Sequence, residues 1–185
     1  MPFDLGSKDS CMIGGNLSTN AGGLKVIRNK SQHANIIGLK AVLPNGKILD
    51  NMTTLKKDNT GYDLKQLFVG AEGTLGVITE CAILCPPLAT KKNIAVVALN
   101  KFEDVFKLLQ MTKASLGDIL HSYEVMDQAC MEVVVDYEVN AVFPFSKHHP
   151  CYVFIAIGSS ETPSKDNSAT SEPDRDLERL YDLFG

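Results

Sequence analysis

The sequence IGGNLSTNAGG occupies residues 13–23 and decides how the first half of the chain is interpreted. It holds four glycines in eleven residues. Glycine lets a backbone turn sharply and approach a ligand closely, and the amides of such a turn form an anion-binding concavity. Side-chain donors and acceptors are added by Asn16, Ser18, Thr19 and Asn20. The stretch therefore suits a nucleotide pyrophosphate or the edge of a flavin, with a Gly/Asn-rich surface turn as the alternative.

The stretch matches neither of two common nucleotide-binding motifs. No strand leads into a GxGxxG, and no helix with a ribose-binding acid follows, as a Rossmann fingerprint requires. No GK[ST] ends the stretch, so it is not a P-loop.

A second glycine-rich stretch, GAEGTLGVIT, spans residues 70–79. Glu72 sits between small residues, and Gly73 and Gly76 flank a short turn that leads into a strand. This pattern indicates backbone and Glu72 contacts to a cofactor. The alternative is a helix end and a tight turn that feed the strand. Between the two stretches, residues 56–64 open with two lysines that could neutralise phosphate but are also typical of a solvated turn.

The composition is that of an ordinary globular protein. The 185 residues are 44% hydrophobic and 22% charged, with a formal net charge of −4. These values exclude a mainly disordered chain and a strongly basic nucleic-acid binder. No apolar run reaches the roughly 18 residues of a membrane helix. We therefore predict neither a nucleic-acid partner nor a membrane span.

The cysteines and histidines give little support for a metal site. Five cysteines without a CxxC spacing predict reduced, mostly buried thiols rather than a zinc ribbon or a disulfide scaffold. Cys81 and Cys85 would lie roughly 13 Å apart on one strand, too far to chelate one ion. His148 and His149 are adjacent and would point to opposite faces of a strand. No metal ligand is therefore assigned in this chain.

Hydrophobic patterning predicts an α+β chain with a domain boundary at Pro86 and Pro87. Before the boundary we expect a strand at 35–44, an Asn45–Gly46 hairpin turn, a returning strand at 47–50, a short helix at 63–68 and a strand at 76–85. After it we expect a strand at 94–99, a helix at 101–117, a strand at 121–126, a helix at 127–135, a strand at 151–157, a solvated loop at 158–173 and a helix at 174–185.

Two details sharpen the prediction for the second half. The helix at 101–117 carries apolar residues at helical spacing that we expect to face the core, namely Phe102, Val105, Phe106, Leu109 and Leu116. Asp127 is a predicted N-cap for the next helix. The alternating order of strands and helices fits a ferredoxin-like α+β layer.

The order of several motifs along the chain is more specific than any one of them. Together they resemble the FAD-linked D-2-hydroxyacid dehydrogenases of the vanillyl-alcohol-oxidase/PCMH-type flavoprotein superfamily, and most of all their D-2-hydroxyglutarate dehydrogenase branch. The motifs that carry the resemblance are Asp4-Leu5-Gly6, Cys11 with Ile13-Gly14-Gly15-Asn16, Ser18-Thr19-Asn20-Ala21-Gly22-Gly23, residues 57–64, Glu72-Gly73-Thr74-Leu75-Gly76-Val77-Ile78-Thr79 and Cys85-Pro86-Pro87. A weaker match runs on through residues 123–127 to about residue 157.

The resemblance implies a fold and a cofactor. Residues 1–87 would form the second half of a PCMH-type FAD-binding domain, and residues 88–185 part of a ferredoxin-like α+β substrate domain. By the same resemblance, FAD would be bound by two groups of residues. They are Ile13, Gly14, Gly15, Asn16, Ser18, Thr19, Asn20, Gly22 and Gly23 in the first stretch, and Glu72, Gly73, Gly76 and Ile78 in the second.

The resemblance also implies an activity, which is the oxidation of (R)-2-hydroxyglutarate to 2-oxoglutarate. Electrons would pass to an electron-transfer flavoprotein. The longer parent protein, of which this chain would be a part, would lie in the mitochondrial matrix. A D-lactate dehydrogenase of the same superfamily and a non-catalytic truncated isoform are the alternatives.

The family pattern is incomplete in this sequence. Members of the family have an upstream lobe with another phosphate loop, and a C-terminal region with substrate arginines and a zinc-like divalent metal. Neither is found in this sequence, so we expect the metal only in a longer parent protein. We therefore expect a central fragment, assign no catalytic residue, and expect this chain alone to be inactive, because catalysis needs the whole positioned site. Residues 1–6 carry neither a basic nor an apolar targeting segment.

Overall fold

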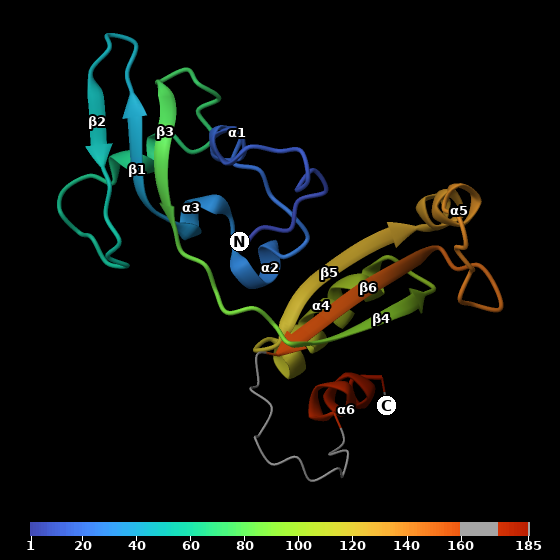
Figure 1. The fold of residues 1–185 in the computed structure, drawn as a ribbon. Coiled ribbons are helices and arrows are strands. Elements are labelled where there is room, and N and C mark those ends of the chain that lie inside the picture. Colours follow the sequence, from blue (N-terminus) through green and yellow to red (C-terminus); the bar gives the residue numbers. More distant parts are fainter. Residues whose placement is uncertain (160–173, 185) are drawn as a thin grey trace. The chain divides into compact units, whose positions relative to one another are not determined.

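The computed structural model describes residues 1–159 and 174–184, and the chain divides into two compact units, Met1–Pro87 and Leu88–Gly185 (Figure 1). Most of the predicted loop over 158–173 lies outside the described residues. The cofactor and substrate roles assigned to the two units stay predictions.

A three-stranded antiparallel sheet forms the centre of the first unit. Its order is β2-β1-β3, with β1 at Ile36–Val42, β2 at Ile48–Asn51 and β3 at Val77–Ile83. The predicted hairpin is confirmed, because β1 pairs with β2 and the Leu43 amide donates to the Lys47 carbonyl at 2.8 Å. Gly46 supplies the positive φ of +78° that this turn requires.

The first unit also holds short helices, namely α1 (Ile13–Ser18), α2 (Val26–Asn29), α3 (Gln32–Asn35) and the 3₁₀ helix η1 (Leu64–Leu67). Of these, α1 contacts β3, and α3 and η1 contact β1. The expectation of a turn throughout residues 13–18 is wrong, since this segment is helical. The physical reason is Leu17, which is fully buried against Ile36 and Val69. Burial of one apolar side chain stabilises a short helix that glycine-rich sequence alone would not form.

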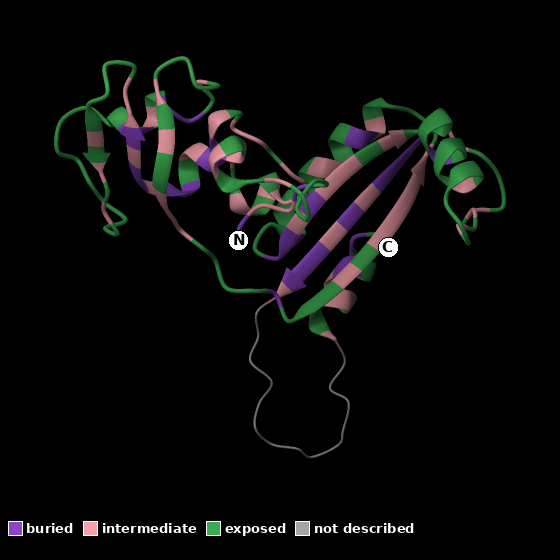
Figure 2. Cartoon of the chain, turned by 45° about the horizontal axis from the view of Figure 1, so that its top comes forward, coloured by how far each residue is buried: buried purple, intermediate pink, exposed green. Residues whose placement is uncertain are grey.

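The second unit is built from longer elements around a second three-stranded sheet. They are β4 (Lys91–Leu99), α4 (Glu103–Leu116), β5 (Leu120–Asp127), α5 (Gln128–Tyr137), β6 (Cys151–Ser159) and α6 (Arg175–Asp182). The sheet order is β4-β6-β5, and both pairings are antiparallel. The central strand β6 is mostly buried, as the purple colouring in Figure 2 shows. The predicted α+β class and the alternating order of elements are confirmed.

The buried face of α4 differs from the predicted one. Val105 and Leu116 are buried as expected, and so is Leu108. Phe102 and Phe106 are more than half exposed and instead pack edge-to-face on each other, with ring centroids 5.5 Å apart. The Asp127 cap is confirmed, since its Oδ1 accepts the Cys130 amide at 2.7 Å, a hydrogen bond that lowers the pKa of the carboxyl.

The cysteines are free thiols, but the prediction that most are buried is wrong. Cys151 is buried, Cys11 and Cys81 are half-buried, and Cys85 and Cys130 are exposed. Burial raises the pKa of the Cys81 and Cys151 thiols. Among the described residues, no helix is long and apolar enough to cross a membrane.

Candidate cofactor site

The two glycine-rich stretches lie against each other in the first unit. The Glu72 amide donates to the Ser18 carbonyl at 2.8 Å, and the Gly70 amide donates to the Leu17 carbonyl at 2.9 Å. A Cβ built on Gly14 would lie 3.8 Å from the Ile78 carbonyl oxygen, so α1 also approaches β3 closely. Residues that are separated in sequence by the whole β1–β2 hairpin therefore form one surface.

The backbone at this junction is held in an uncommon conformation on both sides. Asn20 has φ +48° and Glu72 has φ +49°. Left-handed φ values in non-glycine residues cost free energy and cluster at sites where a ligand is bound. Gly70, with φ +82°, lies directly beside Asn20, since a Cβ added there would be 3.4 Å from the Asn20 Cβ. The hydrogen bonds between the two stretches hold this geometry in place.

Asn20 also carries a buried acceptor that is not used. Its Oδ1 atom is buried and receives no hydrogen bond from any described residue. An unsatisfied buried polar atom costs roughly 1–3 kcal/mol. A ligand with a donor at this position would remove that cost.

Other polar side chains of the first stretch are already engaged within the protein. Asn16 Nδ2 donates to Cys11 Sγ at 3.2 Å, and Thr19 Oγ1 donates to the Gly15 carbonyl at 3.0 Å. These contacts stabilise the helix end and leave the backbone as the main candidate binding group.

Gln32 is a structural residue of this site that sequence reasoning missed. Its side chain is fully buried, and its Nε2 donates to the Asn16 carbonyl at 2.8 Å and to the Ala21 carbonyl at 2.7 Å. Gln32 thus fixes both sides of the loop that contains Asn20. An isolated glutamine gives no sequence signal for such a role.

The glycines of the site fall into two groups. A Cβ on Gly23 would lie 2.1 Å from the Asp4 carbonyl oxygen, and one on Gly76 would lie 2.5 Å from the Val42 carbonyl oxygen. These two glycines are required by the protein's own packing. Gly15 and Gly22 have negative φ and nothing within 4 Å of a built Cβ. A glycine in a helix costs about 1 kcal/mol relative to alanine, and no packing among the described residues requires one at position 15.

The remaining predicted residues divide between surface and core. Ile13 is exposed at the start of α1, and Gly73 is exposed with φ +79°. The Ile78 side chain packs against both core clusters of this unit, so only its backbone faces the junction. Lys56 and Lys57 are exposed in the loop between β2 and η1.

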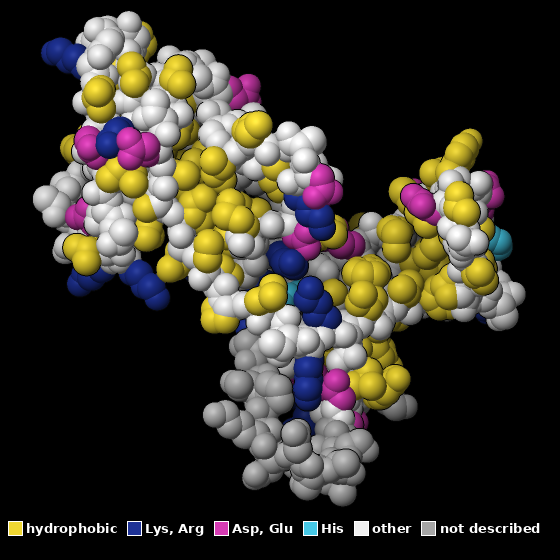
Figure 3. Space-filling view, in the orientation of Figure 1, with side chains coloured by type: hydrophobic (Ala, Val, Ile, Leu, Met, Phe, Trp, Pro, Cys, Tyr) yellow, Lys and Arg dark blue, Asp and Glu magenta, His cyan; other side chains and the backbone are white. Residues whose placement is uncertain are grey.

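Hydrophobic side chains gather on the surface over β3 and α1, shown in yellow in Figure 3. Met12 is 78% exposed, Val77 66% and Leu75 43%. Exposed apolar side chains next to an unusual backbone suit a flat ring system better than a charged ligand.

The residues present fit one side of an FAD site. The fit rests on the unused Asn20 Oδ1, the open backbone at Gly15 and Gly22, and the apolar surface beside them. No group of three or more His, Cys, Asp or Glu side chains among residues 1–159 and 174–184 could hold a metal ion.

Comparisons with known proteins agree with this chemistry. A family described as "FAD binding domain" matches residues 1–51. The chain is 46% identical over 167 residues to "D-2-hydroxyglutarate dehydrogenase, mitochondrial" of Arabidopsis thaliana, covering 90% of this chain and 30% of that protein. It is 52% identical over 134 residues to the protein of the same name from Bos taurus, covering 72% of this chain and 25% of that protein.

A solved structure supports the fold. The chain superposes on alkyldihydroxyacetonephosphate synthase with a TM-score of 0.70 at 17% sequence identity, covering 99% of this chain and 33% of that chain. This likeness concerns the fold alone.

These results are consistent with a partial chain of the FAD-dependent hydroxyacid dehydrogenase class. Within that class the predicted resemblance is confirmed, and the chain is consistent with a part of a protein of the D-2-hydroxyglutarate dehydrogenase family. The chain spans about 30% of the length of the Arabidopsis relative.

Proposed function

We propose that this chain is part of an enzyme that oxidises (R)-2-hydroxyglutarate to 2-oxoglutarate with FAD as the electron acceptor. The observation that carries the proposal is the junction of the two glycine-rich stretches, where the Glu72 amide bonds to the Ser18 carbonyl. Identity of 46% to a relative that bears this enzyme's name supports the choice of substrate.

In this proposal the first unit is the FAD-binding domain and the second begins the substrate domain. FAD supplies the hydride acceptor, while the protein orients the cofactor and excludes water. The open backbone at Gly15 and Gly22 would approach the cofactor, and the Asn20 amide oxygen would accept a hydrogen bond from it. The Glu72 backbone holds the loop that contains Gly73 against α1.

The proposal extends to parts of the system that this chain does not span. A divalent metal and the catalytic base would come from other segments of a longer protein. An electron-transfer flavoprotein would accept the electrons, and the setting would be the mitochondrial matrix. The Arabidopsis and Bos taurus relatives are both named mitochondrial.

Titration of the purified chain with FAD tests the cofactor site. We expect saturable binding, followed by flavin fluorescence and by a rise in the melting temperature. Asn20→Gly keeps the positive φ and deletes the amide oxygen, so we expect about tenfold weaker binding, or more. Asn140→Gly is the matched control, because Asn140 also has positive φ (+71°) but lies in the second unit. Equal loss in both variants, or no binding, contradicts the site.

Substrate profiling of the longer protein tests the reaction. With a dye as electron acceptor, we expect turnover of (R)-2-hydroxyglutarate well above that of D-lactate. Turnover of D-lactate alone would make the protein a D-lactate dehydrogenase of the same superfamily. FAD binding without turnover of either acid would favour a non-catalytic form.

A further inference from the structure

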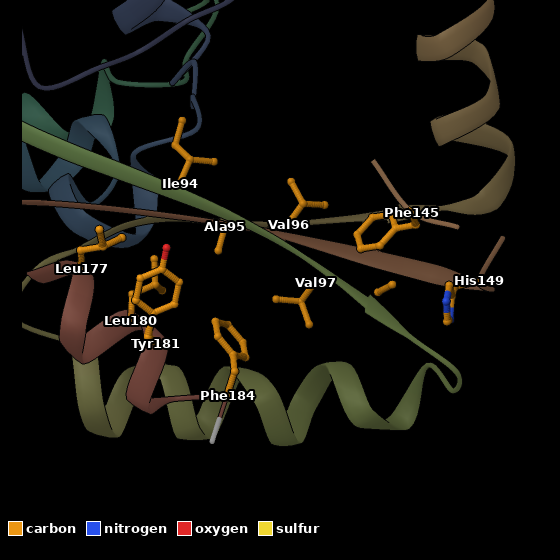
Figure 4. A pocket seen from close by; sticks show the side chains of 11 residues that line it. Ile94, Ala95, Val96, Val97, Phe145, His149, Leu177, Leu180, Tyr181 and Phe184 are labelled. Carbon is orange, nitrogen blue, oxygen red and sulfur yellow. The ribbon is translucent and has the colours of Figure 1, made fainter. Parts of the chain in front are cut away.

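A cavity of about 460 Å³ beside β4 and α6 is lined mainly by apolar side chains, among them Val97, Leu180 and Phe184 (Figure 4). It lies in the unit that the resemblance implies is incomplete, so its lining does not define a binding site. The first unit has a better-defined arrangement, in which polar side chains connect segments that lie far apart in the sequence. The short helix α3 is at the centre of these connections.

Two neighbouring residues of α3 reach toward the two glycine-rich stretches. Gln32 donates to the carbonyls of Asn16 and Ala21 and so holds the first stretch. The next residue, His33, is hydrogen-bonded to Gln66, which lies in η1, shortly before the second stretch. Helix α3 leads directly into β1, so both connections start beside the central strand of the sheet.

His33 and Gln66 form a reciprocal pair. The His33 ring Nδ1 and the Gln66 Oε1 are 2.5 Å apart, and the Gln66 Nε2 donates to the His33 carbonyl at 3.0 Å. A carbonyl only accepts, so the second bond determines which end of the Gln66 amide faces the ring. The amide oxygen therefore faces Nδ1, and Nδ1 is the ring nitrogen that carries the hydrogen. Both hydrogen bonds are partly buried, and they join residues 33 positions apart in the sequence.

Apolar packing alone does not determine the orientation of the second stretch. Phe68 and Val69 are buried directly before it, one in each core cluster of the unit. Burial of apolar surface is non-directional, whereas a hydrogen bond requires a defined distance and angle. The His33–Gln66 pair therefore supplies a direction that the core does not. The backbone bonds from the second stretch to α1 follow within a few residues.

We propose that His33 and Gln66 are positioning residues of the cofactor site. Their two hydrogen bonds orient the chain that leads from η1 into the second glycine-rich stretch, so that this stretch meets the loop that Gln32 holds. Both side chains act through the backbone of residues 70–72 rather than by contact with FAD. The inference rests on the proposed function, because it takes the junction of the two stretches to be the FAD site.

A matched pair of variants separates the hydrogen bond from the ring that carries it. His33→Phe keeps a ring and removes the Nδ1 donor, which leaves the Gln66 oxygen unpaired. His33→Asn removes the ring and keeps a donor, because the amide nitrogen of asparagine occupies the same place in the side chain as Nδ1. We expect His33→Phe to weaken FAD binding about tenfold or more, and His33→Asn to recover most of that loss. His148→Phe is the control, because His148 lies in the second unit.

Hydrogen exchange without FAD gives a second readout. In His33→Phe we expect the amides of Gly70 and Glu72, which bond to α1, to exchange about tenfold faster, while exchange in β1 is unchanged. A variant that is merely less stable would exchange faster in β1 as well.

A double variant tests whether the two residues act as one pair. Gln66→Met removes the amide from the other partner. We expect the chain with both His33→Phe and Gln66→Met to bind FAD no more weakly than the weaker single variant, because both changes remove the same interaction.

Four results would overturn the proposal. They are FAD binding by His33→Phe that equals that of the original chain, an equal loss in His33→Asn, additive losses in the double variant, and exchange in β1 that rises as much as exchange at Gly70 and Glu72. If the original chain binds no FAD, the proposed function fails separately. In that case, faster exchange at Gly70 and Glu72 alone would still support the positioning role, and unchanged exchange would overturn it too.

Discussion

The two units use their backbones differently. Among the described residues, three of the four non-glycine residues with positive φ lie in the first unit, as do all five such glycines. The strands and helices of this unit are short, and its core consists of two small clusters. In the described part of the second unit, only Asn140 has positive φ, and the unit is organised around one buried strand, β6. Irregular backbone thus marks the unit that carries the proposed cofactor site, and regular packing marks the other.

The largest expected effect tests whether the units are independent. Val153 is fully buried in β6, and Val153→Asp would bury an unpaired charge at a cost of about 4 kcal/mol. We expect the second unit to lose protection from hydrogen exchange while the first keeps its own. The control is Val125→Asp, at the position that pairs with Val153 but is exposed on β5. Loss of protection in both units would show that they unfold as one.

Two neighbouring glycines of the first unit differ in the space around them. A Cβ on Gly23 would lie 2.1 Å from the Asp4 carbonyl oxygen, so Gly23→Ala should cost about 2 kcal/mol. Gly22 has open space, so Gly22→Ala should change stability by less than about 0.5 kcal/mol yet weaken FAD binding. Chemical denaturation and FAD titration measure the two effects. A variant pair with equal stability would contradict the packing argument.

A smaller effect is expected at the end of the second unit. The Arg179 guanidinium bonds to both Asp118 carboxylate oxygens, at 2.6 and 3.0 Å, and to the Ser115 carbonyl. Because the pair is partly exposed, Arg179→Lys should cost only about 0.5 kcal/mol. We expect hydrogen exchange in α6 to be faster in the variant than in the original chain. At high salt, we expect this difference in exchange rate to be smaller. No change in α6 exchange would mean that Leu180, which is buried, holds the helix alone.

The smallest expected effect depends on pH. The hydrogen bond from the Cys130 amide lowers the pKa of Asp127 below its ordinary 3.8. The Asp127 carboxylate therefore contributes its full stabilisation above about pH 3.8, and this stabilisation is lost as the pH falls through the lowered pKa. Asp127→Asn should reduce the difference in melting temperature between about pH 6 and about pH 3. An unchanged difference would show that the cap does not contribute to acid sensitivity.

Most regular elements could be predicted from the sequence, because hydrophobic period and turn residues determine them locally. The Asn45–Gly46 hairpin and the Asp127 cap are examples. Helix α1 could not be predicted from the sequence, because it depends on the burial of Leu17 against residues distant in sequence. The exposure of Phe102 and Phe106 escaped prediction for a related reason, since helical spacing shows that a stripe exists without showing which side is covered.

The candidate site was predictable only in part. Glycine-rich composition pointed to both stretches, but it could not separate glycines required by packing, such as Gly23, from those with open space, such as Gly22. That distinction needs the position of Asp4 in space. The supporting role of Gln32 arises only when the loop closes around its side chain.

The edge position of β4 has a consequence for the order of folding. The β1–β2 hairpin closes a short turn, whereas β4 must wait for β6, since Leu99 pairs with Cys151 across a long intervening segment. Closing a loop about ten times longer costs about 2 kcal/mol more in chain entropy. During synthesis β4 therefore spends the longest time with both edges unpaired. Lys91 and Lys92 begin the strand, with Asn93 between them and the apolar run, and lie where flanking charges oppose aggregation of a nascent chain.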